Sequence, residues 1–119
     1  MPSTKINYLE LPATDPEATR AFFTKTFAWT FTEYGPDYCA REGGEIDVGF
    51  YRATDKASRT EQGAALIVFQ SDDLEQMQAG VKAAGGEIIK PIFDFPGGRR
   101  FHFTEPSGNE FAVWAIAKS

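Results

Sequence analysis

The same order of expected secondary-structure elements occurs twice along the chain, and this repeat restricts the fold more than any other feature. Each half contains a strand, a helix and then three strands. The first repeat covers about residues 4–52 and the second about residues 63–117, with an exposed linker over 53–62. An internal repeat means that two similar units pack side by side. We expect an α+β chain in which two βαβββ repeats form a half-open curved sheet with the helices on its outer face.

Two similar helix starts support the repeat. Thr14-Asp15-Pro16-Glu17 offers a capping side chain, a proline suited to the first helical position and an acidic residue at the positive end of the helix dipole. Ser71-Asp72-Asp73-Leu74-Glu75 offers the same kind of start in the second half, with Ser71 or Asp72 as the expected cap. The first helix is expected to end at Phe27, and Gly85-Gly86 is expected to end the second.

The expected strands are short runs with strand-like patterns between turn residues. They are Lys5–Leu11, Trp29–Glu33, Tyr38–Arg41, Ile46–Tyr51, Gly63–Gln70, Glu87–Phe93, Arg99–Thr104 and Glu110–Ile116. Alternation in the fourth of these places Ile46, Val48 and Phe50 on one face.

Length and charge narrow the class of protein. The 119 residues are expected to form a single domain. The net charge of −5 argues against a nucleic-acid or polybasic membrane partner. The apolar runs are too short to span a bilayer, and the first residues do not have the pattern of a signal peptide. The single Cys39 permits no internal disulfide, so we expect a cytoplasmic location.

Several motifs together resemble the vicinal oxygen chelate superfamily, which includes glyoxalase I, extradiol dioxygenases, fosfomycin-resistance transferases and bleomycin-binding proteins. The resemblance rests on the βαβββ repeat, the opening stretch Ile6–Asp15, the helix end Phe22-Phe23…Phe27-Ala28-Trp29 and the turn Phe103-Thr104-Glu105-Pro106-Ser107-Gly108-Asn109. It covers nearly the whole chain. It implies a cup-shaped ligand site, and in the enzymes of the superfamily a divalent metal ion bound by His, Glu or Gln.

The positions that match the metal ligands of the superfamily do not carry those residue types. They are Tyr8, Leu66 (or Ala65 if the register shifts by one), Ala112 and a position near Val48. Aliphatic side chains cannot bind a metal ion, and a lone Tyr is a poor anchor. The single histidine, His102, lies in the penultimate strand, away from these positions. We therefore expect neither a metal nor another cofactor, and we assign no catalytic residue.

Aromatic residues make up 14% of the chain and suggest a lining for the cup, although a Phe-rich core would account for them equally well. If Phe101 and Phe103 pack under the helices, Arg100 and His102 face the concave side. His102 would then contact a ligand, or else a carboxylate such as Glu110 or Asp47. The expected ligand-binding residues are Tyr8, Val48, Phe50, Leu66, Arg100, His102, Glu110, Ala112 and Trp114.

The sequence predicts a metal-independent protein of the glyoxalase/bleomycin-resistance type that sequesters or senses a small aromatic or amphipathic molecule. The resemblance also implies a homodimer with a shared cup. The alternative is a glyoxalase-like lyase or isomerase with a shifted site that uses His102, Glu110 or Asp47, so enzymatic activity is left open. A third possibility is a partner-binding module whose cup is filled.

Overall fold

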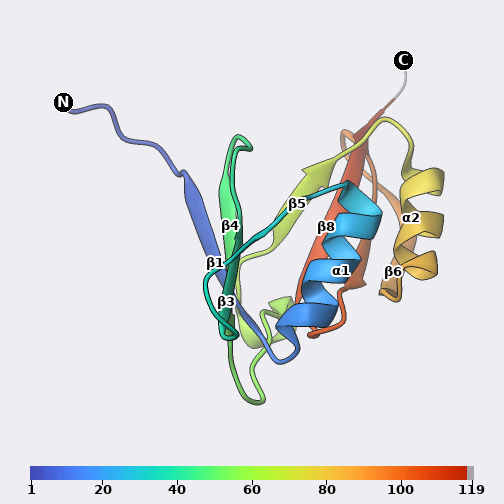
Figure 1. Cartoon of the computed structure of the whole chain (residues 1–119). Helices are drawn as coiled ribbons and strands as arrows, with labels where there is room; N and C mark the ends of the chain where they lie inside the picture. The colour runs from blue at the N-terminus through green and yellow to red at the C-terminus, as the bar shows by residue number, and fades with distance from the viewer. Residues whose placement is uncertain (118–119) are drawn as a thin grey trace.

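A computed structural model describes residues 1–117 and contains two four-stranded sheets with a helix for each (Figure 1). The first repeat holds β1 (Tyr8–Ala13), α1 (Pro16–Phe27), β2 (Thr32–Glu33), β3 (Tyr38–Arg41) and β4 (Asp47–Arg52). The one-turn helix η1 (Thr60–Gln62) follows. The second repeat holds β5 (Ile67–Gln70), α2 (Leu74–Ala83), β6 (Glu87–Phe95), β7 (Gly98–Thr104) and β8 (Glu110–Ile116).

Each sheet has the same topology. The strand order is β1-β4-β3-β2 in sheet one and β5-β8-β7-β6 in sheet two. The first and last strands of each repeat pair in parallel, and the remaining neighbours are antiparallel. This confirms the predicted α+β fold of two βαβββ repeats.

Both helices start within the predicted motifs, but the second is capped by Asp73 and not by Ser71 or Asp72, the residues expected from the sequence. The Asp15 carboxylate accepts a hydrogen bond of 3.1 Å from the Ala18 amide, and Pro16 takes the first helical position. The Asp73 carboxylate accepts from the Gln76 amide at 3.0 Å. Each cap satisfies an amide that has no carbonyl partner within its helix.

Helix α1 packs against both sheets, so the core is shared between the repeats (Figure 1). The Phe23 ring lies 5.5 Å from Phe50 of β4 and 5.3 Å from Phe111 of β8, centroid to centroid. Phe22 lies 5.7 Å from Phe103 of β7. Burying these rings gives the shared core its largest hydrophobic contribution.

Three predicted strands begin three or more residues later in the structure than the sequence suggests. β1 begins at Tyr8 instead of Lys5, β2 contains only Thr32–Glu33, and β5 begins at Ile67 instead of Gly63. Trp29 lies outside a strand because its ring stacks on Phe23 at 4.9 Å and extends the core beyond the end of α1. At Trp29, packing against the core outweighs the local strand pattern.

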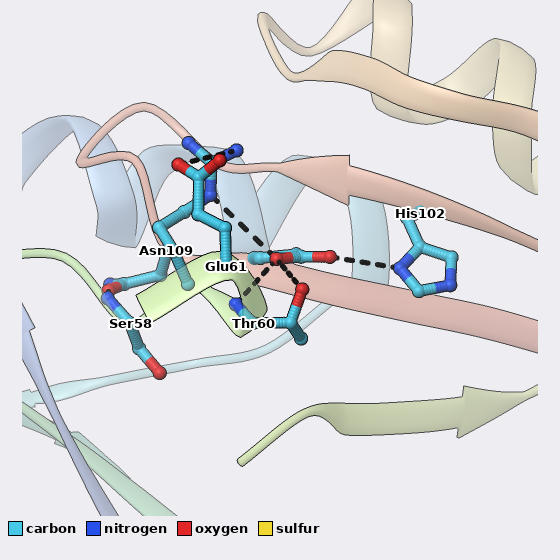
Figure 2. A network of polar contacts seen from close by, with 7 residues as sticks. Ser58, Thr60, Glu61, His102 and Asn109 are labelled. Carbon is cyan, nitrogen blue, oxygen red and sulfur yellow. Dashed lines mark hydrogen bonds and ion pairs between the residues drawn. The ribbon is translucent and has the colours of Figure 1, made fainter. Parts of the chain in front are cut away.

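The predicted linker is more ordered than its polar composition suggests. The Ser58 amide donates to the Asn109 side chain at 2.7 Å, and the Ser58 carbonyl accepts from the Glu110 amide at 2.8 Å. Arg59 and Ser58 are half-buried. The prediction of an exposed linker over 53–62 is therefore wrong for this part of the segment, which lies against the start of β8 (Figure 2).

Candidate functional site

One face of sheet two is turned away from the helices. Phe101 and Phe103 of β7 and Phe111 of β8 lie in the core, so the residues between them point to the opposite side. We call that side the helix-free face of sheet two. It carries Phe93, Phe95, Arg100, His102, Glu110, Ala112 and Trp114.

Aromatic rings and one guanidinium lie together on this face. The Arg100 guanidinium lies 5.4 Å from the ring centroids of both Phe93 and Phe95. The Phe95 and Trp114 centroids are 6.1 Å apart, and those of Phe93 and His102 are 5.9 Å apart. Such a surface offers π-faces and a positive charge to a planar molecule.

Glu110 and His102 form a buried hydrogen-bonded pair beside this cluster (Figure 2). His102 Nδ1 lies 3.0 Å from Glu110 Oε2, and only 2% of His102 is exposed. Glu110 Oε1 accepts from the amide and the hydroxyl of Thr60, each at 2.8 Å, and lies 3.7 Å from Arg59. The linker therefore fixes the carboxylate, which in turn orients the imidazole.

Two buried nitrogens on the helix-free face have no hydrogen-bond partner within residues 1–117. They are His102 Nε2 and Arg100 Nε. Buried polar atoms normally have partners, so these two mark a place where a ligand can supply them. While Nδ1 donates to Glu110, a neutral His102 presents Nε2 as an acceptor, whereas Arg100 can only donate. The sequence analysis left open whether His102 contacts a carboxylate or a ligand. In the structure Nδ1 pairs with the Glu110 carboxylate, and Nε2 remains available to a ligand.

The pKa of Glu110 is lowered in the folded chain. Burial alone would raise it, but hydrogen bonds from Thr60 and His102 favour the charged carboxylate more strongly. A carboxyl group whose pKa is lowered on folding stabilises the fold at pH values above its pKa in the unfolded chain. This stabilisation is lost as the pH falls through the pKa of the group in the folded chain.

We expect Glu110→Gln to cost roughly 2 kcal/mol at pH 7, because charge-assisted hydrogen bonds are lost inside the protein. Below about pH 4.3, the ordinary pKa of Glu, the difference from the parent chain should shrink, since Glu110 itself becomes protonated. Urea unfolding at several pH values measures this, with the exposed Glu87→Gln as the control. A difference that stays constant down to pH 3 would contradict the assignment.

A second buried network holds the β7–β8 turn against α1. Glu105 accepts from the Thr19 hydroxyl and from the Asn109 side chain, each at 2.6 Å. Asn109 also donates to the Pro12 carbonyl at 2.7 Å. Burial raises the pKa of Glu105. Gly108 completes the turn at φ +91°, a conformation that favours glycine. This network sets the position of Glu110, the next residue along the chain after Asn109.

Tyr8 lies on the corresponding face of sheet one. Its hydroxyl is hydrogen-bonded to that of Tyr38, which donates to Glu10 at 2.9 Å. Burial, with the hydrogen bonds to Tyr8 and Glu10, raises the pKa of Tyr38. Gly49 lies beneath both tyrosines, where a Cβ would collide with their hydroxyls. Tyr8 is 40% exposed, so this face is open to a partner or ligand.

The structure corrects the expected face of two residues. Val48 and Phe50 belong to the core, and the Phe50 ring stacks on Phe23. They therefore share no surface with Tyr8, because Gly49 is the residue of β4 that faces the same side as the Tyr8 ring. Leu66 precedes β5 and is half-buried.

Of the predicted ligand-binding residues, the structure brings five together on the helix-free face of sheet two: Arg100, His102, Glu110, Ala112 and Trp114. Ala112 is fully buried in the isolated chain. The neighbouring Arg99 instead pairs with Glu75 at 2.7 Å. Sequence reasoning missed Phe93, Phe95 and Thr60. Extending the predicted strand beyond Phe93 would have placed Phe95 on the same face. Nothing in the local sequence indicated Thr60.

The side chains at the expected metal positions do not fit an ion. When the two repeats are aligned on their helix N-caps, Glu10 of β1 corresponds to Val68 of β5. Glu10 pairs with Gly49 and Val68 pairs with Ala112. The first-repeat position that corresponds to Ala112 is therefore Gly49 and not Val48. Neither residue has a donor side chain. Within the described part of the chain, no group of three or more His, Cys, Asp or Glu residues could hold a metal ion.

The fold and these motifs agree with a direct match to known proteins. Residues 5–113 match the Glyoxalase/Bleomycin resistance protein/Dioxygenase superfamily, and the chain belongs to it. This confirms the resemblance seen in the sequence.

A curated relative is the Anthracycline biosynthesis protein DnrV of Streptomyces peucetius, 28% identical. The match covers 90% of this chain but 45% of DnrV, so the chain spans about half the length of that relative.

Solved structures share the fold. A glyoxalase/bleomycin resistance protein/dioxygenase family enzyme from Burkholderia phytofirmans PsJN has a TM-score of 0.79 at 17% identity, with 96% of this chain and 100% of that chain covered. TnmS3, an antibiotic binding protein from Streptomyces sp. CB03234, has a TM-score of 0.74 at 16% identity, with 98% and 99% covered. Among the described residues, no helix has the length and apolar character needed to cross a membrane.

Proposed function

We propose that this chain binds a small planar aromatic molecule on the helix-free face of sheet two, without a metal ion. The observation that carries the proposal is Arg100 held over Phe93 and Phe95, with Trp114 beside them. Stacking on these rings would supply apolar contact, and the guanidinium would attract an anionic or carbonyl oxygen. His102 Nε2 adds an acceptor for a ligand hydroxyl.

The names of two similar proteins support this class of ligand. One takes part in anthracycline biosynthesis and the other is an antibiotic binding protein. Fused aromatic rings with carbonyl and hydroxyl oxygens suit the donors and acceptors of this face. Because the chain covers less than half of DnrV, we carry over only the kind of molecule and no activity.

We further propose a homodimer in which sheet one of one copy faces sheet two of its partner. An isolated sheet face is only half of a cup, and the helix-free face of sheet one exposes Tyr8 and Tyr51. β1 and β5 are edge strands of their sheets, which a second chain can cover. The buried thiol of Cys39 is compatible with a cytoplasmic location, which we include in the proposal.

Calorimetric titration with anthraquinone-2-sulfonate, a planar anionic probe, tests the binding proposal. Protein treated with a chelator should bind one probe per chain. Arg100→Gln and Trp114→Ala should each weaken binding about tenfold, which corresponds to about 1.4 kcal/mol. Lys82→Gln, which removes an exposed positive charge on α2, is the matched control and should leave the affinity unchanged.

The proposal fails if chelator-treated protein does not bind the probe, or if Arg100→Gln and Lys82→Gln have equal effects. Decane-1-sulfonate separates stacking from charge, because it has the same head group on a flexible chain. If it binds as tightly as anthraquinone-2-sulfonate, the aromatic face does not select planar molecules. Dimer formation is tested separately by sedimentation.

The pair formed by Glu110 and His102 favours a second candidate function, an enzyme of the glyoxalase-like lyase or isomerase kind. A carboxylate that orients an imidazole, with Nε2 left free, is suited to proton transfer. Mass spectrometry of probe recovered from the protein separates the two functions. Unchanged probe supports binding alone, whereas conversion that His102→Gln abolishes would support an enzyme.

A further inference from the structure

A cavity lies between the two sheets, on the side where they face the core. Its volume is about 320 Å³. Leu9 and Val48 line it from sheet one, and Ile67, Phe69 and Phe111 line it from sheet two. Trp29, just beyond the end of α1, contributes an indole ring. Its lining in sheet two comes mainly from the core side, and Val68, the strand partner of Ala112, is the one lining residue that it shares with the helix-free face of sheet two.

One arginine lies at this otherwise apolar cavity. The Arg41 guanidinium lies 5.0 Å from the Trp29 ring centroid and packs against Gly44. Within residues 1–117 it has no carboxylate partner, unlike Arg20, Arg52, Arg59 and Arg99. Its side chain is half-buried, and stacking on Trp29 holds the planar group in one place. Glu45 is the other charged residue that lines the cavity, and it is exposed to solvent.

The charge and size of the cavity define a ligand class. An apolar body fits against Leu9, Val48 and Ile67, and a carboxylate pairs with the planar guanidinium of Arg41 in a bidentate manner. The volume is that of about ten groups the size of a water molecule, at roughly 30 Å³ each. We propose that this cavity between the sheets is a second ligand site, for a carboxylate with an apolar body of about ten carbons.

Tryptophan fluorescence can report on this site alone. The chain has two tryptophans, so Trp114→Phe leaves Trp29 as the single indole. Decanoate, titrated below the concentration at which it forms micelles, should shift the Trp29 emission in a saturable manner. Decylammonium should bind at least tenfold more weakly than decanoate, because its charge is repelled by Arg41.

Arg41→Gln is the decisive variant and should weaken decanoate binding at least tenfold while leaving the binding of decan-1-ol unchanged. Arg52→Gln is the matched control, because Arg52 lies on the same sheet and pairs with Asp37 at 2.9 Å. Equal effects of the two substitutions on decanoate would overturn the proposal, as would the absence of saturable binding.

Two further variants keep the test valid if Arg41→Gln does not fold. Arg41→Lys retains the charge and should keep most of the decanoate affinity, although it loses the bidentate geometry. Ile67→Phe fills the cavity and should block decanoate and decan-1-ol alike. If Ile67→Phe leaves both affinities unchanged, the ligands bind elsewhere. Arg41→Gln should not change the affinity for anthraquinone-2-sulfonate, so this proposal and the proposed function fail independently.

Discussion

Phe23→Ala is expected to lower the free energy of unfolding by about 4 kcal/mol, the largest effect of any single substitution considered for this chain. Phe23 of α1 is fully buried, and its ring lies against Phe50 of sheet one and Phe111 of sheet two. Its ring lies 4.9–5.7 Å from its aromatic neighbours, which are Phe22, Phe27, Trp29, Phe50 and Phe111. Removing the ring leaves a cavity that side chains on two different sheets cannot easily close.

Urea unfolding followed by circular dichroism measures this effect. Tyr34→Ala is the control, because it also removes an aromatic ring but from a side chain that is 54% exposed. We expect it to cost less than about 1 kcal/mol. Phe23→Leu should recover part of the loss, since most of the volume is kept. A cost below about 2 kcal/mol for Phe23→Ala would show that the repeats do not share a core through this ring.

Asn109→Ala is expected to cost about 3 kcal/mol, because it leaves several buried groups without partners. The Asn109 amide donates to Pro12 and Glu105 and accepts from Ser58, so one side chain joins β1, the β7–β8 turn and the linker. Without it, the buried Glu105 carboxyl loses one of its hydrogen-bond donors. The linker also loses one of the contacts that hold it against β8 (Figure 2).

Two measurements separate the effects of Asn109→Ala. Urea unfolding gives the stability, with the exposed Asn7→Ala as the matched control. Trypsin cleavage after Lys56 or Arg59 reports on the linker and should become faster in Asn109→Ala under native conditions. If cleavage stays as slow as in the parent chain, Asn109 does not hold the linker, whatever its contribution to stability.

The repeat and the helix starts were predictable because they depend on local chemistry. Asp15 and Asp73 cap their helices through contacts that span only three residues. The outward direction of Arg100 and His102 followed from alternation with Phe101 and Phe103. In sheet one the same alternation was counted from Val48 instead of Gly49, so Val48 and Phe50 were assigned to the wrong face. A shift of one position reverses every side chain of a strand.

The contacts made by the linker could not be predicted from the sequence. Thr60 reaches Glu110 across 50 residues, and Ser58 reaches Asn109 across 51. The polar composition of this segment indicated exposed coil, because polar residues are as common in exposed coil as in surface segments that make ordered contacts. Only the fold reveals that Glu110 is a buried anchor whose carboxylate orients His102.

The proposed function is the binding of planar aromatic molecules to the helix-free face of sheet two without a metal ion. Two-dimensional NMR of ¹⁵N-labelled, chelator-treated protein titrated with anthraquinone-2-sulfonate tests it most directly. We expect the largest amide shifts between Arg100 and Thr104 and between Glu110 and Trp114. Saturation with shifts confined to other elements, or binding that requires an added divalent ion, would contradict it.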